Sequence, residues 1–133
     1  MIVVDTSALV AFLRGDRTPA ALKLEELERQ ETPFSIPAVC VQEVLQGARD
    51  EREWKLLTGI LQDQSFLSPG DPWATHAEAA RIFFDCRRKG ITLRGTLDCL
   101  VAAMALENDA VLLHEDRDFE KMKAVRALRT LGG

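Results

Sequence analysis

Two kinds of hydrophobic pattern alternate along this chain. Residues 2–4 and 111–113 are apolar at every position, which is typical of strands buried on both faces of a parallel sheet. Between them, apolar residues recur every three or four positions, which is typical of helices that face a core. This alternation predicts an α/β fold with a mostly parallel β-sheet flanked by helices.

Capping and breaking residues set the limits of the expected elements. Thr6 and Ser7 are suited to cap the first helix, Pro37 to begin a later one, and Gly90 to end the longest. The expected helices cover residues 6–14, 19–29, 37–47, 50–61, 73–89, 96–107 and 116–123, and the expected strands cover 2–4, 33–36, 65–67, 111–113 and 125–128. The expected core positions of the second and fourth helices are Leu22, Leu24, Leu27, Trp54, Leu57 and Leu61.

Length and composition favour one domain. The chain has 133 residues, of which 47% are hydrophobic, so a single domain over 1–133 with its own core is expected. Its cysteines are Cys40, Cys86 and Cys99, an odd number among apolar neighbours, so we expect buried thiols rather than disulfides. We find no leader pattern and no run of membrane-spanning length, so a cytoplasmic protein without a membrane segment is expected.

Acidic residues follow both apolar strands. Asp5 comes directly after the first strand, and Asp116 and Asp118 come shortly after the second. Because the carboxyl ends of parallel strands meet at one edge of a sheet, these acids are expected to lie near one another.

Two further acids lie on apolar helix faces. Glu43 has Val39, Cys40 and Gly47 at helical spacing, and Asp98 lies in the first turn of the strongly apolar helix. A carboxylate on an apolar face is unfavourable unless it is paired or binds a metal. No Lys or Arg stands at helical spacing to Glu43, which leaves metal binding, Gln46 or a distant arginine as its partner.

Clustered carboxylates favour Mg²⁺ or Mn²⁺, which prefer oxygen ligands and can activate water for attack on a phosphodiester. His76 and His114 have no partner at ligand spacing, so zinc is disfavoured and both are expected to be structural. A formal net charge of −4 counts against a nucleic-acid ligand, although the acids of a metal site would themselves contribute to it.

Each acid also has a simpler explanation. Asp5 and Asp116 could be helix N-caps, Asp98 a first-turn carboxylate favoured by the helix dipole, and Glu43 one partner of an ion pair. Asp118 is the residue most easily explained as a plain surface acid. The set, with its order and spacing, is what favours a metal site.

At these residues the chain resembles the PIN-domain family, and within it the VapC-type toxins, over essentially its whole length. Residues 1–9 resemble the first strand and first acid of the family, and 36–44 resemble the second-acid segment. Residues 96–103 resemble the third-acid helix, and 112–119 resemble the fourth-acid loop with its trailing Asp-Phe. Family members commonly carry Asn or Thr where this chain has Glu115, which adds a negative charge beside Asp116.

The resemblance implies a three-layer PIN-like domain and a metal-dependent endoribonuclease with a four-carboxylate site. Asp5, Asp98 and Asp116 would bind Mg²⁺ or Mn²⁺, and Glu43 would be a further ligand or would position the attacking water. Thr6, Ser7 and Asp118 would support them. The implied partners are an RNA substrate, a small antitoxin that blocks the acidic pocket, often with a basic side chain, and a second copy of the chain in a homodimer.

Cationic residues near the expected site could contact RNA phosphates. Arg94 and Arg14 are the main candidates, with weaker ones at Arg17, Arg87, Arg88 and Lys89. The simpler explanation is that they are solvated helix ends, where cations are favoured by the dipole.

Other acid-rich enzymes fit less well. A haloacid-dehalogenase-type phosphatase would need an acid at position 7, where this chain has Ser7, and a receiver domain would need a mid-chain acceptor Asp and a late Lys at strand ends. A 5′-nuclease relative would need a longer chain. A PIN ribonuclease for RNA maturation and a catalytically silent PIN-like binding module both stay open.

Overall fold

The computed structural model describes residues 1–132 and contains short strands alternating with helices. The elements are β1 (Ile2–Val4), α1 (Thr6–Leu13), α2 (Pro19–Arg29), β2 (Ile36–Pro37), α3 (Ala38–Leu45), α4 (Glu51–Leu61), β3 (Phe66–Leu67), α5 (Pro72–Arg88), α6 (Leu97–Glu107), β4 (Val111–His114), α7 (Arg117–Met122) and β5 (Arg129–Gly132). The α/β fold class is therefore confirmed. The single domain over 1–133 stays a prediction, and residue 133 lies outside the described residues.

All strand pairings in the described part of the chain are parallel. β4 lies between β1 and β5, with Val3 opposite Leu112, and β2 pairs with β3. An isolated bridge between Val3 and Ser35 joins the two sets of strands. Because the strands run in one direction, the residues that follow β1 and β4 emerge at the same edge, as the sequence predicts.

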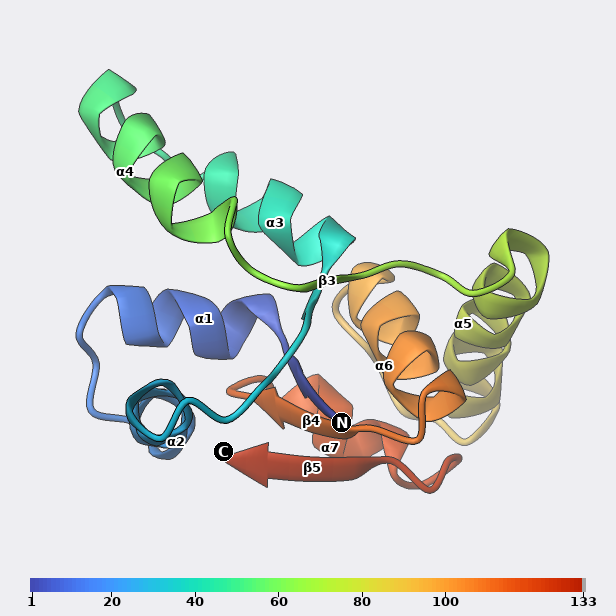
Figure 1. Cartoon of the computed structure of the whole chain (residues 1–133). Coiled ribbons are helices and arrows are strands. Elements are labelled where there is room, and N and C mark those ends of the chain that lie inside the picture. The colour runs from blue at the N-terminus through green and yellow to red at the C-terminus, as the bar shows by residue number, and fades with distance from the viewer. Residues whose placement is uncertain (133) are drawn as a thin grey trace.

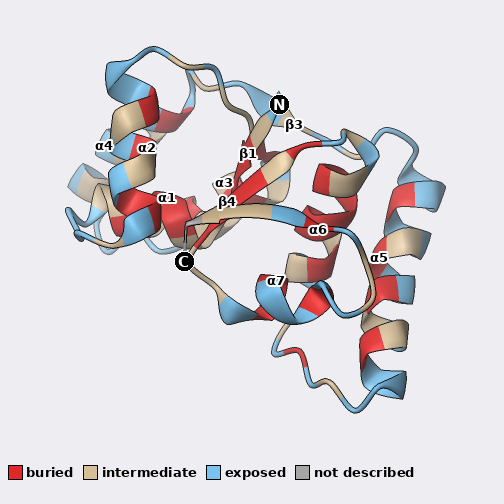
Figure 2. Ribbon diagram, turned by 90° about the horizontal axis from the view of Figure 1, so that it is seen from below, coloured by how far each residue is buried: buried red, intermediate tan, exposed pale blue. Residues whose placement is uncertain are grey.

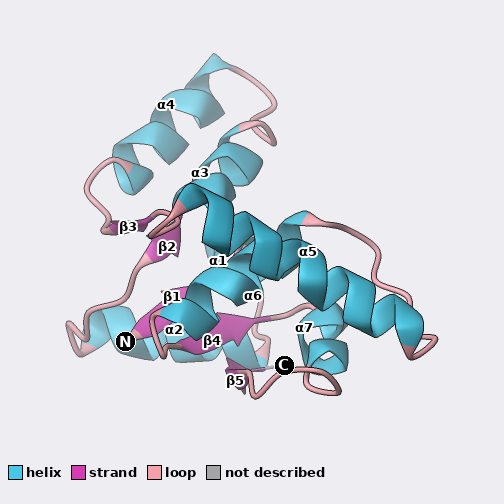
Figure 3. Ribbon diagram, turned by 90° about the vertical axis from the view of Figure 1, so that its right-hand side faces the viewer, coloured by secondary structure: helices cyan, strands magenta, loops and turns pink. Residues whose placement is uncertain are grey.

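Helices cover both faces of this sheet. α1 and α2 lie on one side, and α5, α6 and α7 lie on the other, which gives the expected three layers (Figure 1). Val3, Val4, Leu112 and Leu113 have no exposed surface, as expected for strands covered on both faces (Figure 2). The α3–α4 hairpin extends away from the sheet, at the end of the molecule where β2 and β3 lie (Figure 3).

The first helix is capped by Asp5, the N-cap that the simpler explanation of this acid expected, and not by Thr6 or Ser7. The side chain of Asp5 accepts a hydrogen bond from the backbone N–H of Ser7. Thr6 and Ser7 are the first two residues of the helix itself. Their hydroxyls are therefore free to bind other partners.

Two predicted core positions and one strand are wrong. Leu22 and Trp54 are 39% and 44% exposed, because they lie on the outer faces of α2 and α4, whereas Leu24, Leu27 and Leu61 are buried. The last strand is β5 and not residues 125–128. The backbone N–H groups of Val125 and Arg126 both bond to the carbonyl of Met122, which closes a turn after α7 and delays the strand.

Leu57 is only partly buried and packs against the core from its edge. Cys40, Cys86 and Cys99 are buried free thiols, as expected. Within residues 1–132, no helix combines the length and the apolar character that crossing a membrane requires.

Candidate functional site

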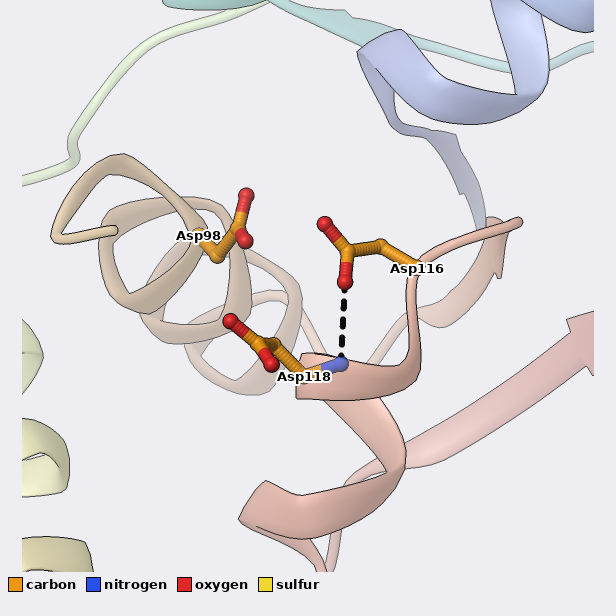
Figure 4. Close-up of side chains that lie close together, drawn as sticks. All are labelled: Asp98, Asp116 and Asp118. Carbon is orange, nitrogen blue, oxygen red and sulfur yellow. Dashed lines mark hydrogen bonds between the residues drawn. The ribbon is translucent and has the colours of Figure 1, made fainter. Parts of the chain in front are cut away.

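Three carboxylates converge at the edge of the sheet where β1 and β4 end. Asp98 lies in the first turn of α6, Asp116 is the N-cap of α7, and Asp118 is the second residue of α7. One oxygen from each lies within 4.8 Å of the others, and the three side chains point toward one another (Figure 4). This acid cluster, as we call Asp98, Asp116 and Asp118, is the type of group that could hold a metal ion.

Asp118 is not a surface acid, contrary to its simplest explanation from the sequence. Its side chain is fully buried, since α7 also buries Phe119 and Met122. Its Oδ2 accepts a hydrogen bond from the backbone N–H of Arg94 at 2.8 Å. Its Oδ1 accepts no hydrogen bond from the described residues, although Nζ of Lys121 lies 3.3 Å away. A buried carboxylate oxygen with so few partners suits coordination of a cation.

Asp116 is held in place on several sides. Its Oδ1 accepts hydrogen bonds from the backbone N–H of Asp118 at 3.0 Å and from Nη2 of Arg94 at 2.7 Å. Burial acts to raise the pKa of Asp116, but these two donors outweigh it and lower that pKa below its ordinary value. Asp116 therefore carries a negative charge more readily than Asp98 does.

Asp98 is shifted in the opposite direction. Burial raises the pKa of Asp98 to about 7, and the negative charges of Asp5 and Asp116 add to the effect. Arg94 and Lys121 already lie against Asp116 and Asp118, and a further cation would favour the ionised form of Asp98 as well. The acid cluster thus has the electrostatic character of a cation site.

Asp5 lies beside the acid cluster but outside it. Its carboxylate is buried, and Oδ2 accepts hydrogen bonds from the backbone N–H and the hydroxyl of Ser7 at 2.9 and 2.7 Å. Burial raises the pKa of Asp5 in spite of these bonds. The charges of Asp5 and Asp98 repel one another, as do those of Asp5 and Asp116, so Asp5 belongs to the same electrostatic neighbourhood as the acid cluster.

Glu43 is connected to the site through a hydroxyl. The side chain of Thr6 donates a hydrogen bond to Oε1 of Glu43 at 2.8 Å, which ties α3 to the first turn of α1. Glu43 is half-buried and lies outside the acid cluster. Of the four acids expected to form the centre, the structure thus brings Asp98 and Asp116 within ligand distance of one another, and it adds Asp118.

Ser7 and Glu115 connect the two strand ends. The hydroxyl of Ser7 accepts a hydrogen bond from the backbone N–H of Glu115 at 2.9 Å while donating to Asp5. The side chain of Glu115 accepts from the backbone N–H of Ala20 at 2.8 Å, at the N-terminus of α2. The extra negative charge of Glu115 therefore lies at the N-terminus of α2, where the helix dipole favours it.

The two arginines expected to contact RNA lie in different places. Arg94 is 72% exposed and rests its guanidinium against the acid cluster. Arg14 follows α1 at the end opposite Asp5, about 12 Å along the helix axis, and is exposed. Only Arg94 is close enough to act together with the acids.

Sequence reasoning missed the role of one polar residue in the core. His114 is fully buried at the end of β4 and makes hydrogen bonds through both ring nitrogens. The available signal was a histidine in an apolar strand, which we interpreted as structural without naming its partners. His76, by contrast, is exposed and pairs through Nδ1 with the carbonyl of Pro72.

Comparison with known proteins places this geometry in a family. The family model described as "PIN domain" matches residues 2–125. A VapC ribonuclease of Mycobacterium bovis is 33% identical over 130 residues, covering 97% of this chain and 96% of that protein. Both matches extend over nearly the whole chain.

Solved structures share the fold. The crystal structure of VapBC2 from Rickettsia felis, bound to a DNA fragment from their promoter, matches with a TM-score of 0.73 at 17% identity, covering 98% of this chain and 97% of that chain. VapBC-5 from Mycobacterium tuberculosis, described as a member of the VapBC family of toxin-antitoxin systems, matches with a TM-score of 0.66 at 19% identity, covering 97% and 95%. The family model and the Mycobacterium bovis relative show that the chain belongs to the PIN-domain family and, within it, to the VapC-type proteins.

Proposed function

We propose that this chain is a divalent-metal-dependent endoribonuclease and the toxin of a toxin–antitoxin pair. The ribonuclease activity is proposed from the VapC relative, whose name states it. The antitoxin partner is proposed from the toxin-antitoxin systems to which a structural neighbour is assigned. The observation in this chain that carries the proposal is the acid cluster, in which the buried Oδ1 of Asp118 accepts no hydrogen bond from the described residues and lies 3.3 Å from Nζ of Lys121.

The donor set fits Mg²⁺ or Mn²⁺. The acid cluster offers carboxylate oxygens alone, which these hard cations prefer, and no thiol or imidazole that would select zinc. When bound, either ion lowers the pKa of a water molecule and offsets the charge of a phosphodiester. We propose that Asp98, Asp116 and Asp118 hold the ion and that Asp5 completes the site.

The neighbouring side chains would then have separate roles. Ser7 fixes the carboxylate of Asp5, and Thr6 holds Glu43 beside the first turn of α1, from which it would orient a water molecule. Arg94 is exposed and long enough to leave Asp116 and bind a phosphate of the RNA. The ion pair that Arg94 makes with Asp116 also shows that a guanidinium fits against these acids, as a basic antitoxin side chain would require.

The test is RNA cleavage by the purified chain, free of antitoxin, with Mn²⁺, with Mg²⁺ and with EDTA. An Asp98→Asn variant removes one proposed ligand, and Asp63→Asn is the matched control because Asp63 is exposed just beyond α4. We expect cleavage that needs the metal, is retained in the Asp63 variant and is lost in the Asp98 variant. Cleavage that survives Asp98→Asn would contradict the proposed site.

The alternatives are separated by two further measurements. If the chain binds RNA without a metal and cleaves none of the RNAs tested, a silent PIN-like module is favoured. Growth arrest on expression, relieved by a co-expressed small neighbouring protein, distinguishes a toxin from an RNA-maturation enzyme. The homodimer stays a prediction, to be checked by light scattering of the purified chain.

A further inference from the structure

His114 occupies an unusual position for a fully buried histidine. It ends β4, two residues before Asp116, and its Nδ1 accepts a hydrogen bond from the backbone N–H of Asp116 at 3.0 Å. Its Nε2 lies 2.7 Å from Oε2 of Glu120 on α7. One ring therefore connects the backbone of a proposed metal ligand to a carboxylate on the following helix.

These partners fix which ring nitrogen carries the proton. A backbone N–H can only donate, so Nδ1 of His114 must present its lone pair to Asp116. The proton is consequently on Nε2, which donates it to Glu120. This is the arrangement by which a carboxylate orients an imidazole, with a backbone amide in the place that a metal ion usually takes.

Glu120 is itself well anchored. Oε2 also accepts a hydrogen bond from the hydroxyl of Thr130 on β5 at 2.9 Å, and Oε1 accepts from Nζ of Lys123 at 2.8 Å. Burial acts against ionisation, but the bonds from Lys123, His114 and Thr130 lower the pKa of Glu120 to about 2. Three contacts therefore hold the Glu120 carboxylate in the position in which it accepts Nε2–H of His114.

Packing and bonding together leave the ring no freedom to turn. The ring of His114 lies against that of Phe119, with centroids 5.0 Å apart. The backbone of Asp116 is then held by the ring, while its side chain is held by the backbone N–H of Asp118. These two bonds act together with the bond from Nη2 of Arg94, and the Asp116 carboxylate points toward Asp98 (Figure 4).

We propose that His114 is a positioning residue for the metal site: anchored by Glu120 and Thr130, it fixes the backbone of Asp116 and so aims that carboxylate into the acid cluster. The inference rests on the proposed metal site. Partners that orient metal ligands usually contribute roughly tenfold or more to metal affinity. The alternative is that His114 only fills the core, in which case its loss would lower stability and leave metal affinity unchanged.

The test is the affinity for Mn²⁺, measured by calorimetry on the purified chain and its variants at one pH. His114→Phe keeps a ring of similar size but removes both hydrogen bonds. His114→Asn removes the contact with Glu120, yet its side-chain oxygen can accept the N–H two residues on, as in an Asx-turn. We expect the dissociation constant to rise by about tenfold in the Phe variant and to recover most of that loss in the Asn variant.

A second pair of variants tests the anchor without changing the core. Glu120→Ala removes the acceptor of Nε2–H on an exposed helix position, and Lys123→Ala is its comparison, since it removes the bond to Oε1 of Glu120 but leaves the contact between His114 and Oε2. We expect weaker Mn²⁺ binding in the Glu120 variant and unchanged binding in the Lys123 variant. If His114→Phe does not fold, the Glu120 variant decides the question.

The outcomes separate this inference from the function on which it rests. Wild-type protein that binds no Mn²⁺ would contradict the proposed metal site itself. If the wild type binds Mn²⁺ and the His114→Phe and Glu120→Ala variants bind it with the same affinity as the wild type, only the role of His114 is overturned. Equal loss of affinity in the Phe and Asn variants would do the same, since the hydrogen bond to Asp116 would then be irrelevant.

Discussion

Nη2 of Arg94 lies 2.7 Å from Oδ1 of Asp116, so the most exposed cation at the site is paired with one of its proposed metal ligands. The same guanidinium lies 3.8 Å from Oδ2 of Asp118, and these contacts raise the pKa of Arg94. A divalent ion and this guanidinium compete for the same negative charge. Arg94 should therefore weaken the binding of the metal and strengthen the binding of an RNA phosphate.

Replacing Arg94 should separate these effects. In Arg94→Gln, Mn²⁺ should bind roughly twofold to fivefold more tightly, because an exposed ion pair no longer competes with it. The KM for RNA should rise, because a phosphate contact is lost. Calorimetry and initial-rate kinetics check the two effects, with Arg14→Gln as the control at the far end of α1. A lower KM in the Arg94 variant would exclude the phosphate contact.

The titration of Asp98 should be visible in the stability of the metal-free protein. The pKa of Asp98 is raised from 3.8 to about 7 in the folded chain, mainly by burial. Protonation of Asp98 therefore stabilises the fold fully below pH 3.8, and this contribution is lost as the pH rises through 7. Asp98→Asn should have a higher Tm than the wild type at pH 8 in EDTA, and the difference should shrink as the pH falls below 7 and vanish only near pH 3.8. A difference independent of pH would contradict this assignment.

Replacement of two adjacent residues should affect two different properties, the stability of the fold and the affinity for Mn²⁺. Glu115 accepts the backbone N–H of Ala20, so Glu115→Ala should lower stability by about 1 kcal/mol, as loss of a helix cap does, with Mn²⁺ affinity unchanged. Asp116→Ala should abolish Mn²⁺ binding. Denaturant unfolding and calorimetry on both variants provide the comparison. Loss of metal binding in the Glu115 variant would show that its charge acts on the site after all.

Much of the site was predictable because its position follows from strand direction. Asp5 and Asp116 had to emerge at one edge once residues 2–4 and 111–113 were recognised as parallel strands. The burial of Asp118 was not predictable, because it depends on how α7 and the segment around Arg94 fold over it. Strand β5 was also missed, since Arg129-Thr130-Leu131-Gly132 has no apolar run and pairs only because β4 offers a free edge.

Arg126 should be a stability residue with no part in the chemistry. Its guanidinium bonds to both carboxylate oxygens of Glu78 and to Oδ2 of Asp85, which fastens the turn after α7 to α5. Arg126→Met should lower the free energy of unfolding by about 1–2 kcal/mol, a range that allows for partial solvent screening. RNA cleavage well below the Tm should be unchanged. If the fully folded Arg126→Met variant cleaves RNA more slowly than the wild type, this turn also positions α7 for function.

The metal should stabilise the fold through Asp118 in particular. An ion that binds only the folded chain raises stability by RT ln(1 + [L]/Kd), so saturating Mn²⁺ should raise the Tm of the wild type and EDTA should reverse the shift. Asp118→Asn replaces a buried oxygen that lacks a hydrogen-bond donor by a neutral amide, which should remove most of this shift. Asp63→Asn should retain it. If the Asp118 variant shows the full shift, the buried oxygen does not meet the ion, and Asp5 would then be the third carboxylate, as the resemblance to the PIN-domain family implies.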